Sequence, residues 1–187
     1  MYGPGTKPYQ PTGIWEVVGL AGGDTRNYVQ DKGKNLYRRT VYHFWKRMAA
    51  PPNMVAFNAP SREYCAVSRE RTNTPLQALI TLNDPQFVEA ARKLAELAII
   101  ETDGSDQAMI DFITDRVLSR ALKDSELDII QSSKQYLHEY YQAHADDAKL
   151  LLAVGEAKVD ESMDDVTLAT WTMVCNQILN LDEVLNK

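Results

Sequence analysis

From residue 74 onward, the apolar residues of this chain recur at the spacing of one face of an α-helix. The clearest example is the set Phe87, Ala91, Leu94 and Ala98, whose members lie three or four positions apart. The same pattern predicts helices over residues 74–82, 84–100, 106–121, 125–143, 147–154 and 164–180. This part of the chain has no alternating pattern typical of strands. The sequence therefore predicts a mainly α fold, an irregular helical bundle.

Two of these helices carry explicit start signals. Thr74 can cap a helix, Pro75 suits the first helical position, and Gln77 completes a capping box. Asp84 followed by Pro85 repeats the arrangement for the next helix. Gly155 follows the helix predicted over 147–154 and is a candidate for its C-cap.

The first third of the chain is less regular. Prolines at 4, 8 and 11 predict an extended arm, because proline fixes φ and removes a hydrogen-bond donor. Apolar residues at 37, 41, 44, 45 and 48 fall on one helical face and predict a helix over 35–48. Residues 51–73 are predicted to form a long loop, either an irregular connection or short extended segments. We assign residues 1–34 to an extended arm and loop, part of a domain truncated upstream, and 35–187 to a helical C-terminal domain.

Charge is divided unevenly along the chain. Residues 1–100 contain 13 Lys/Arg against 8 Asp/Glu, a net +5, whereas residues 101–187 contain 7 against 18, a net −11. Within 32–71 the ratio is 9 to 2. The division fits either an anionic partner or two halves that pack against each other, and we favour the second slightly. No apolar run approaches the ~20 residues that span a bilayer, and the start of the chain is no signal peptide.

Several strings resemble a known family. They are LYRRTVYHFWKR at 36–47, APSRE at 59–63, RERTNTPLQAL at 69–79 and LNDPQFVEAA at 82–91. With the tail from Trp171 to Glu183, they resemble the C-terminal region of a planctomycete-specific domain family of unknown function. The resemblance covers nearly the whole chain.

The resemblance has three implications. Family members commonly lie downstream of a cytochrome-c-like domain in large exported proteins, which implies a periplasmic or cell-surface location and upstream domains of the same protein as partners. The KPYQPTGIWE stretch at 7–16 normally lies inside a long protein, so we expect this chain to be a fragment. The family supplies no catalytic residues, and the cytochrome-like domain is absent here.

The strongest candidate site is the polar stretch before the helix that starts at Thr74. Arginines beside a helix N-terminus favour an anion. The candidate anion-binding residues are Arg62, Arg69, Arg71, Asn73 and Gln77. The competing interpretation, which we favour, is that the arginines pair with acidic residues while Thr74, Gln77 and Asp84 only cap helices.

Other site chemistry has little support in the sequence. The three histidines are scattered without metal-ligand spacing, so we expect no metal, and no motif indicates a cofactor. Cys65 and Cys175 lie outside any CxxC pair; two buried thiols are expected, with a disulfide as the alternative in an oxidising compartment.

Three functional hypotheses follow. The first is a non-catalytic assembly or binding module that packs on upstream domains and exposes a large apolar surface. The second is part of a hydrolase or redox enzyme whose arginine-rich loop holds an anionic substrate, such as an acidic or sulfated glycan. The third, nucleic-acid binding by the basic 32–71 segment, is the weakest, because the helical spacing of its aromatics indicates core packing.

Overall fold

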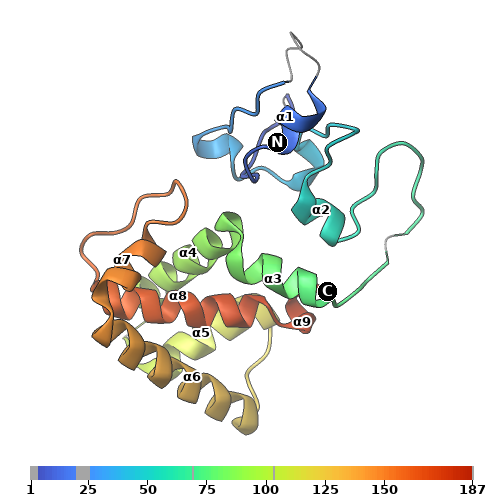
Figure 1. The fold of residues 1–187 in the computed structure, drawn as a ribbon. Helices are drawn as coiled ribbons and strands as arrows, with labels where there is room; N and C mark the ends of the chain where they lie inside the picture. Colours follow the sequence, from blue (N-terminus) through green and yellow to red (C-terminus); the bar gives the residue numbers. More distant parts are fainter. Residues whose placement is uncertain (1–3, 20–25, 69, 103, 187) are drawn as a thin grey trace. The chain divides into compact units, whose positions relative to one another are not determined.

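The computed structural model describes residues 4–19, 26–68, 70–102 and 104–186. The chain divides into two compact units, Met1–Gln77 and Ala78–Lys187, which we call unit 1 and unit 2. The described residues form nine α-helices and two short 3-10 turns, with no strand, so the predicted mainly α fold is confirmed (Figure 1).

Unit 2 consists of helices joined by short turns. Its elements are α3 (Pro75–Asn83, which begins at the end of unit 1), α4 (Pro85–Glu101), α5 (Asp106–Leu118), α6 (Asp124–Ala143), α7 (Ala145–Leu152), α8 (Asp165–Leu179) and α9 (Asp182–Leu185). The first six match the helices predicted from apolar periodicity to within three residues at either end. Only α9, a single turn, was not predicted.

The predicted helix starts are confirmed by hydrogen bonds. Thr74 and Gln77 form a reciprocal capping box, in which the Thr74 N–H donates to Gln77 Oε1 (2.9 Å) and the Gln77 N–H to Thr74 Oγ1 (3.3 Å). Asp84 caps α4 by accepting the N–H of Gln86 at 2.9 Å. Local capping chemistry therefore places these two helices.

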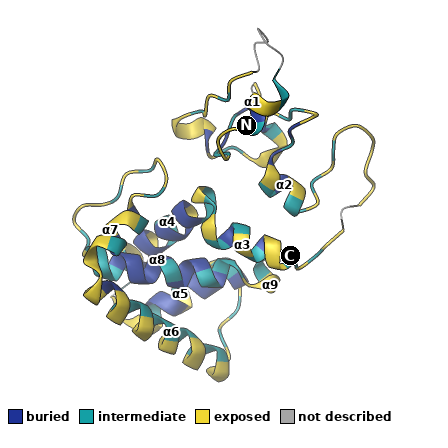
Figure 2. Ribbon diagram, in the orientation of Figure 1, coloured by how far each residue is buried: buried dark blue, intermediate teal, exposed yellow. Residues whose placement is uncertain are grey.

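The core of unit 2 is built around α8. This helix packs on α4, α6 and α7, and Figure 2 shows it buried along most of its length. Its inward residues Leu168, Trp171, Cys175 and Ile178 are all at most 2% exposed, as their helical spacing predicts. Small alanines on α4 let the two helices approach closely; they are Ala91, Ala95 and Ala98, each fully buried.

Buried charges on α4 fix the loop that follows α7. Arg92, 1% exposed, donates to the carbonyl oxygens of Leu152 and Ala157, both at 2.6 Å. Glu89, 2% exposed, accepts the N–H of Ala157 at 2.7 Å. Gly155 lies between them with φ +94°, two residues beyond the C-cap of α7 at Ala153. The bond to Leu152 O satisfies a carbonyl at the end of α7, and the two bonds to Ala157 hold the loop that follows.

Unit 1 is mostly irregular. It contains α1 (Ile14–Val18), the 3-10 turns η1 (Gly33–Asn35) and η2 (Thr40–Tyr42), and α2 (Pro52–Ala56). Residues 4–12 contain no helix, and Thr6 forms a parallel bridge with His43. Around the bridge, the N–H of Thr6 donates to Tyr42 O and that of Phe44 to Thr6 O, both at 2.8 Å. The arm is therefore hydrogen-bonded into unit 1.

The helix predicted over 35–48 is wrong. This stretch contains only the two 3-10 turns and two isolated bridges. Its proposed apolar face is largely exposed: Tyr37 is 56%, Val41 67% and Met48 79% accessible. The run from Thr40 to Trp45 is β-branched and aromatic, which disfavours a helix, and its backbone bonds with the arm instead.

Trp15 is the centre of the small core of unit 1. Its side chain is 1% exposed and contacts Tyr28 edge-on (ring centroids 4.8 Å apart) and Phe44 at 5.3 Å. The ammonium groups of Lys7 and Lys46 lie over the ring, at 5.7 and 5.0 Å from its centroid. This cluster joins the arm, α1 and the 40–46 segment.

Candidate functional site

Unit 1 contains a cavity of about 510 Å³. Residues of the 41–47 and 61–63 segments form most of its wall, together with Gly5 of the arm. The lining residues are Gly5, Val41, Tyr42, His43, Phe44, Trp45, Arg47, Ser61, Arg62 and Glu63. We call this the arginine cavity. Its volume lies in the range of about 300–1,000 Å³ typical of small-ligand sites.

Two arginines line this cavity. Arg47 Nε donates to Glu63 Oε1 at 2.7 Å, and the Arg47 side chain is 83% exposed. Arg62 donates through Nη1 to His43 O (3.0 Å) and through Nη2 to Thr40 O (3.2 Å). Each guanidinium has five N–H donors, so among the described residues these bonds leave donors on both groups.

Arg62 also shapes the wall of the cavity. Its φ of +67° places it in the left-handed region, which a non-glycine residue rarely adopts. The guanidinium lies 5.4 Å from the centroid of the Trp45 ring. By binding the carbonyls of Thr40 and His43 it fixes the 40–45 segment from the opposite wall.

His43 lines the same cavity and is only 3% exposed. Neither ring nitrogen has a partner in hydrogen-bond geometry among the described residues. Burial lowers the pKa of His43 and the charge of Arg62 lowers it further, although the nearby Arg38 backbone acts in the opposite direction. The lowered pKa favours the neutral ring, in which one nitrogen can donate and the other can accept.

Of the five predicted anion-binding residues, the structure places Arg62 at the arginine cavity. Arg71 and Asn73 are exposed in the irregular segment before α3, and Arg69 lies outside the described residues. Gln77 is 3% exposed, and its Nε2 donates to Ala56 O (2.8 Å) and Thr72 Oγ1 (2.9 Å). These bonds give Gln77 a role in holding unit 1 together, and anion binding by the predicted set stays a prediction.

A second cavity, of about 460 Å³, is lined by the segment from Val55 to Glu70. Asn58, at φ +52°, donates from Nδ2 to Thr72 Oγ1 at 2.9 Å and closes this segment into a loop. Glu70 is the charged residue of its lining. Among the described residues of this lining there is no cationic side chain.

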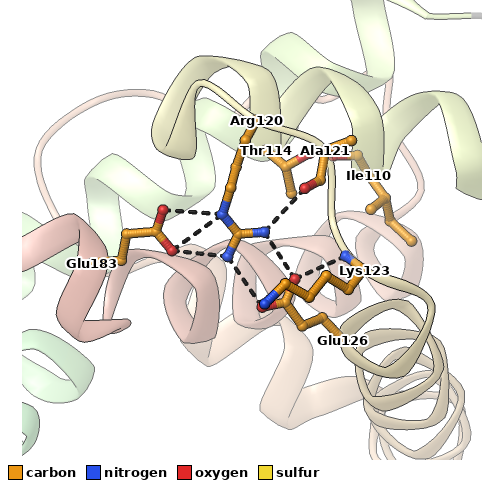
Figure 3. A network of polar contacts seen from close by, with 7 residues as sticks. All are labelled: Ile110, Thr114, Arg120, Ala121, Lys123, Glu126 and Glu183. Carbon is orange, nitrogen blue, oxygen red and sulfur yellow. Dashed lines mark hydrogen bonds and ion pairs between the residues drawn. The ribbon is translucent and has the colours of Figure 1, made fainter.

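A network of polar contacts lies in unit 2, at Arg120 (Figure 3). Arg120 binds Glu126 through Nη1 (2.8 Å) and Nη2 (3.1 Å), and Glu183 through Nε (3.0 Å) and Nη2 (2.8 Å). Nη1 also donates to Ala121 O at 3.0 Å. Glu126 Oε2 in turn accepts the N–H of Lys123.

All five N–H donors of Arg120 are therefore used. The Arg120 guanidinium lowers the pKa of Glu126 to about 2, and the two carboxylates raise that of Arg120. Because no donor is left for a ligand, the cluster acts as a clamp between the turn after α5, the start of α6, and α9. The clamp could not be predicted from sequence, because Glu183 lies 63 residues from Arg120.

The described residues show no sign of a metal site or of a membrane span. They contain no group of three or more His, Cys, Asp or Glu side chains arranged to hold a metal ion. None of their helices is both long and apolar enough to cross a bilayer. Both cysteines are free thiols: Cys175 is buried as expected, whereas Cys65 is exposed, which corrects the expectation for that residue.

Sequence analysis missed most of the arginine cavity. His43, Trp45 and Arg47 were assigned to a helix, so their meeting with Ser61 and Glu63 was not foreseen. The usable signal was the low helix propensity of the 40–45 run, which favours irregular structure that can line a cavity.

Comparison with protein families shows the family to which the chain belongs. The chain matches the family described as PSD1, Protein of unknown function (DUF1553), over residues 1–133, and it belongs to this family. Comparisons with curated proteins and with solved structures found no match.

Proposed function

We propose that this chain is a non-catalytic assembly or binding module, and that unit 1 packs against another domain of a longer exported protein. The proposal rests on one observation: unit 1 leaves more large hydrophobic side chains exposed than it buries. Among its described residues, the buried hydrophobic side chains are Trp15, Leu36, Ala49 and Met54. The large hydrophobic ones left exposed are Val17, Val29, Tyr37, Val41, Phe44, Met48, Val55, Tyr64, Val67 and Leu76.

Ten exposed large apolar residues in so short a unit favour an interaction surface, because a partner that covers them removes apolar area from water. Val67 is fully accessible and Val17 is 85% exposed. Unit 2 differs: it buries fifteen hydrophobic side chains in one core cluster. Unit 1 therefore lacks the core that would stabilise it alone and gains most from a partner.

Buried polar atoms of unit 1 support the same proposal. Side-chain atoms of Thr6, Gln10, Trp15, Arg38 and His43 are buried without a hydrogen-bond partner among the described residues. Each such atom costs about 1–3 kcal/mol. A domain that docks on unit 1 can supply partners or reshape the segments that carry these groups.

The proposed partner is an upstream domain of the same protein in the periplasm or at the cell surface. Support comes from the resemblance of the 7–16 stretch to the interior of longer proteins. The basic character of unit 1, with 11 Lys/Arg against 5 Asp/Glu over residues 1–77, favours an acidic partner surface.

The test is a pull-down of the full chain with the separately expressed upstream portion of a longer family member, followed by thermal melts. We expect association and a raised melting temperature. The double variant Val17→Lys/Met48→Lys should weaken binding about tenfold or more, because it places charge on the proposed surface. Leu150→Lys, at a residue 70% exposed on unit 2, is the matched control. Lack of association, or equal weakening by the control, contradicts the proposal.

A further inference from the structure

We propose that the arginine cavity binds an acidic glycan, meaning sugar rings that carry carboxylate or sulfate groups. This inference does not depend on the assembly role proposed above. It rests on the charges, the donors and acceptors, and the aromatic walls that meet at this cavity.

The charges of the lining favour a ligand with one negative charge per ring. Arg47 and Arg62 contribute two positive charges and Glu63 one negative, while His43 is neutral. The net +1 suits a carboxylate or a sulfate ester. A phosphate monoester, which carries about two negative charges near pH 7, is matched less well.

The free donors are suited to an oxyanion. Arg62 uses only Nη1 and Nη2 in its bonds to the two backbone carbonyls, and Arg47 uses Nε for Glu63. Hydrogen bonds from a guanidinium to an anionic oxygen are among the strong ones in proteins. The contrast is Arg120, whose donors are all used within its own clamp.

The lining also holds acceptors, which a bare anion would not need. Glu63 has a second carboxylate oxygen, and Ser61 offers a hydroxyl. Sugar hydroxyls both donate and accept, so a ring that carries hydroxyls and one acid group satisfies both kinds of lining group.

Aromatic side chains form the remaining wall. Tyr42, Phe44 and Trp45 line the cavity together, and Phe44 is 38% exposed. Arginines stack on two of these rings, with Arg38 at 4.3 Å from the centroid of Tyr42 and Arg62 at 5.4 Å from that of Trp45. An aromatic side chain can pack against the apolar face of a sugar ring. A neighbouring arginine can then bind the acid group that the same sugar carries.

The experiment is calorimetric titration of the full chain with four probes. They are a trimer of galacturonate, a sulfated galactan tetrasaccharide, neutral maltotriose, and inorganic sulfate. We expect at least one acidic oligosaccharide to bind about tenfold or more tighter than maltotriose and than sulfate. The first two probes show whether carboxylate or sulfate is preferred, and either result supports the proposal.

Three variants locate the binding. Arg47→Gln should weaken acidic-oligosaccharide binding about tenfold, because it removes a charged donor. Glu63→Gln should strengthen it, since it removes the negative charge and releases Arg47. Arg116→Gln, an exposed arginine on α5, should change nothing. Circular dichroism melts check that each variant is folded.

Four outcomes of these titrations overturn the proposal, and a fifth titration can overturn it too. The four are no binding of either acidic probe, equal binding of maltotriose, equal binding of sulfate alone, and an unchanged affinity in Arg47→Gln and Glu63→Gln. Tighter binding of a mononucleotide, tested in the same way, also overturns it in favour of a nucleic-acid ligand.

Discussion

At the scale of single residues, Gly155 shows how a buried charge constrains a neighbouring loop. A β-carbon at this position would lie 2.6 Å from Glu89 Oε2 and 2.9 Å from its Cγ. Glu89 is 2% exposed and accepts the N–H of Ala157. An added methyl group must therefore displace a buried, hydrogen-bonded carboxylate, and the positive φ adds strain of its own.

We expect Gly155→Ala to lower the free energy of unfolding by about 2–4 kcal/mol, measured by urea denaturation. Gly104→Ala is the matched control, because Gly104 has φ +79° and nothing within 4 Å of its ideal β-carbon. Gly104→Ala should lower the free energy of unfolding only by the cost of a left-handed φ at a non-glycine residue, about 1–2 kcal/mol. Equal losses in the two variants would show that the contact with Glu89 contributes nothing.

The two cysteines provide a second test at this scale. Cys65 is exposed in unit 1, whereas Cys175 lies in the core of α8, where burial raises the pKa of its thiol well above the usual range. Because only the thiolate reacts, a thiol-specific chromophoric reagent should label one cysteine rapidly in the folded protein and two after denaturation. Rapid labelling of both in the folded state would contradict the packing of α8. Cys65→Ser identifies which thiol reacts.

At the scale of elements, the Arg120 clamp makes stability depend on acid pH. The folded pKa of Glu126, about 2, lies below its ordinary value of 4.5. Its contribution is therefore complete above pH 4.5 and is lost as pH falls from 4.5 toward 2. We expect Glu126→Gln to be less stable than the parent at pH 7 and to lose less stability across that window, in thermal melts at several pH values.

The control for this prediction is Glu139→Gln. Glu139 is exposed on the same helix and lies outside the clamp, where it accepts a hydrogen bond from Gln135. It should leave the melting temperature and its pH dependence nearly unchanged. If Glu126→Gln behaves in the same way, the bidentate pairing with Arg120 does not stabilise α6.

The same elements show what the sequence could predict. From α3 to α8, local signals agree with the packing: Thr74 and Asp84 cap their helices, and the apolar stripe of α8 is buried. Over 35–48 the local signals conflict, because helical spacing coincides with residues of low helix propensity. There the hydrogen bonds of Thr6 with the 42–44 backbone decide the conformation, and no local pattern reveals them.

In the candidate site, too, local sequence signals identified single residues but not the contacts between distant segments. Arg62 was identified from sequence because it stands in a polar loop. Its partners, the carbonyl oxygens of Thr40 and His43, are about twenty residues away and depend on the tertiary fold. Arg120 was missed for this reason too, since Glu183 is 63 residues distant. Sequence pattern finds chemistry within one segment, and it fails where two segments meet.

At the scale of the whole molecule, the two units differ in how well each can stand alone. Unit 2 has a continuous core, with fifteen buried hydrophobic residues and α8 packed on α4, α6 and α7. Unit 1 buries little apolar surface and is mostly irregular. Since net stability is a small difference between burial and conformational entropy, a small core is insufficient for independent folding.

We therefore expect a fragment of residues 72–187 to fold alone, with a helical circular dichroism spectrum and a cooperative melt close to the main transition of the full chain. It retains Thr72 and Thr74, so the cap of α3 is preserved. A fragment of residues 1–77 should show no cooperative melt by itself. Adding the upstream partner domain should then produce one, because binding supplies the missing burial.

The two fragments separate the competing accounts of unit 1. If residues 1–77 melt cooperatively without a partner, the exposed apolar residues are tolerated by an independent fold and the assembly proposal fails. If they fold only with residues 72–187, the acidic half of this chain is the partner, as the net −12 of residues 78–187 against +6 of residues 1–77 would favour. Folding with the upstream domain alone locates the missing burial outside this chain.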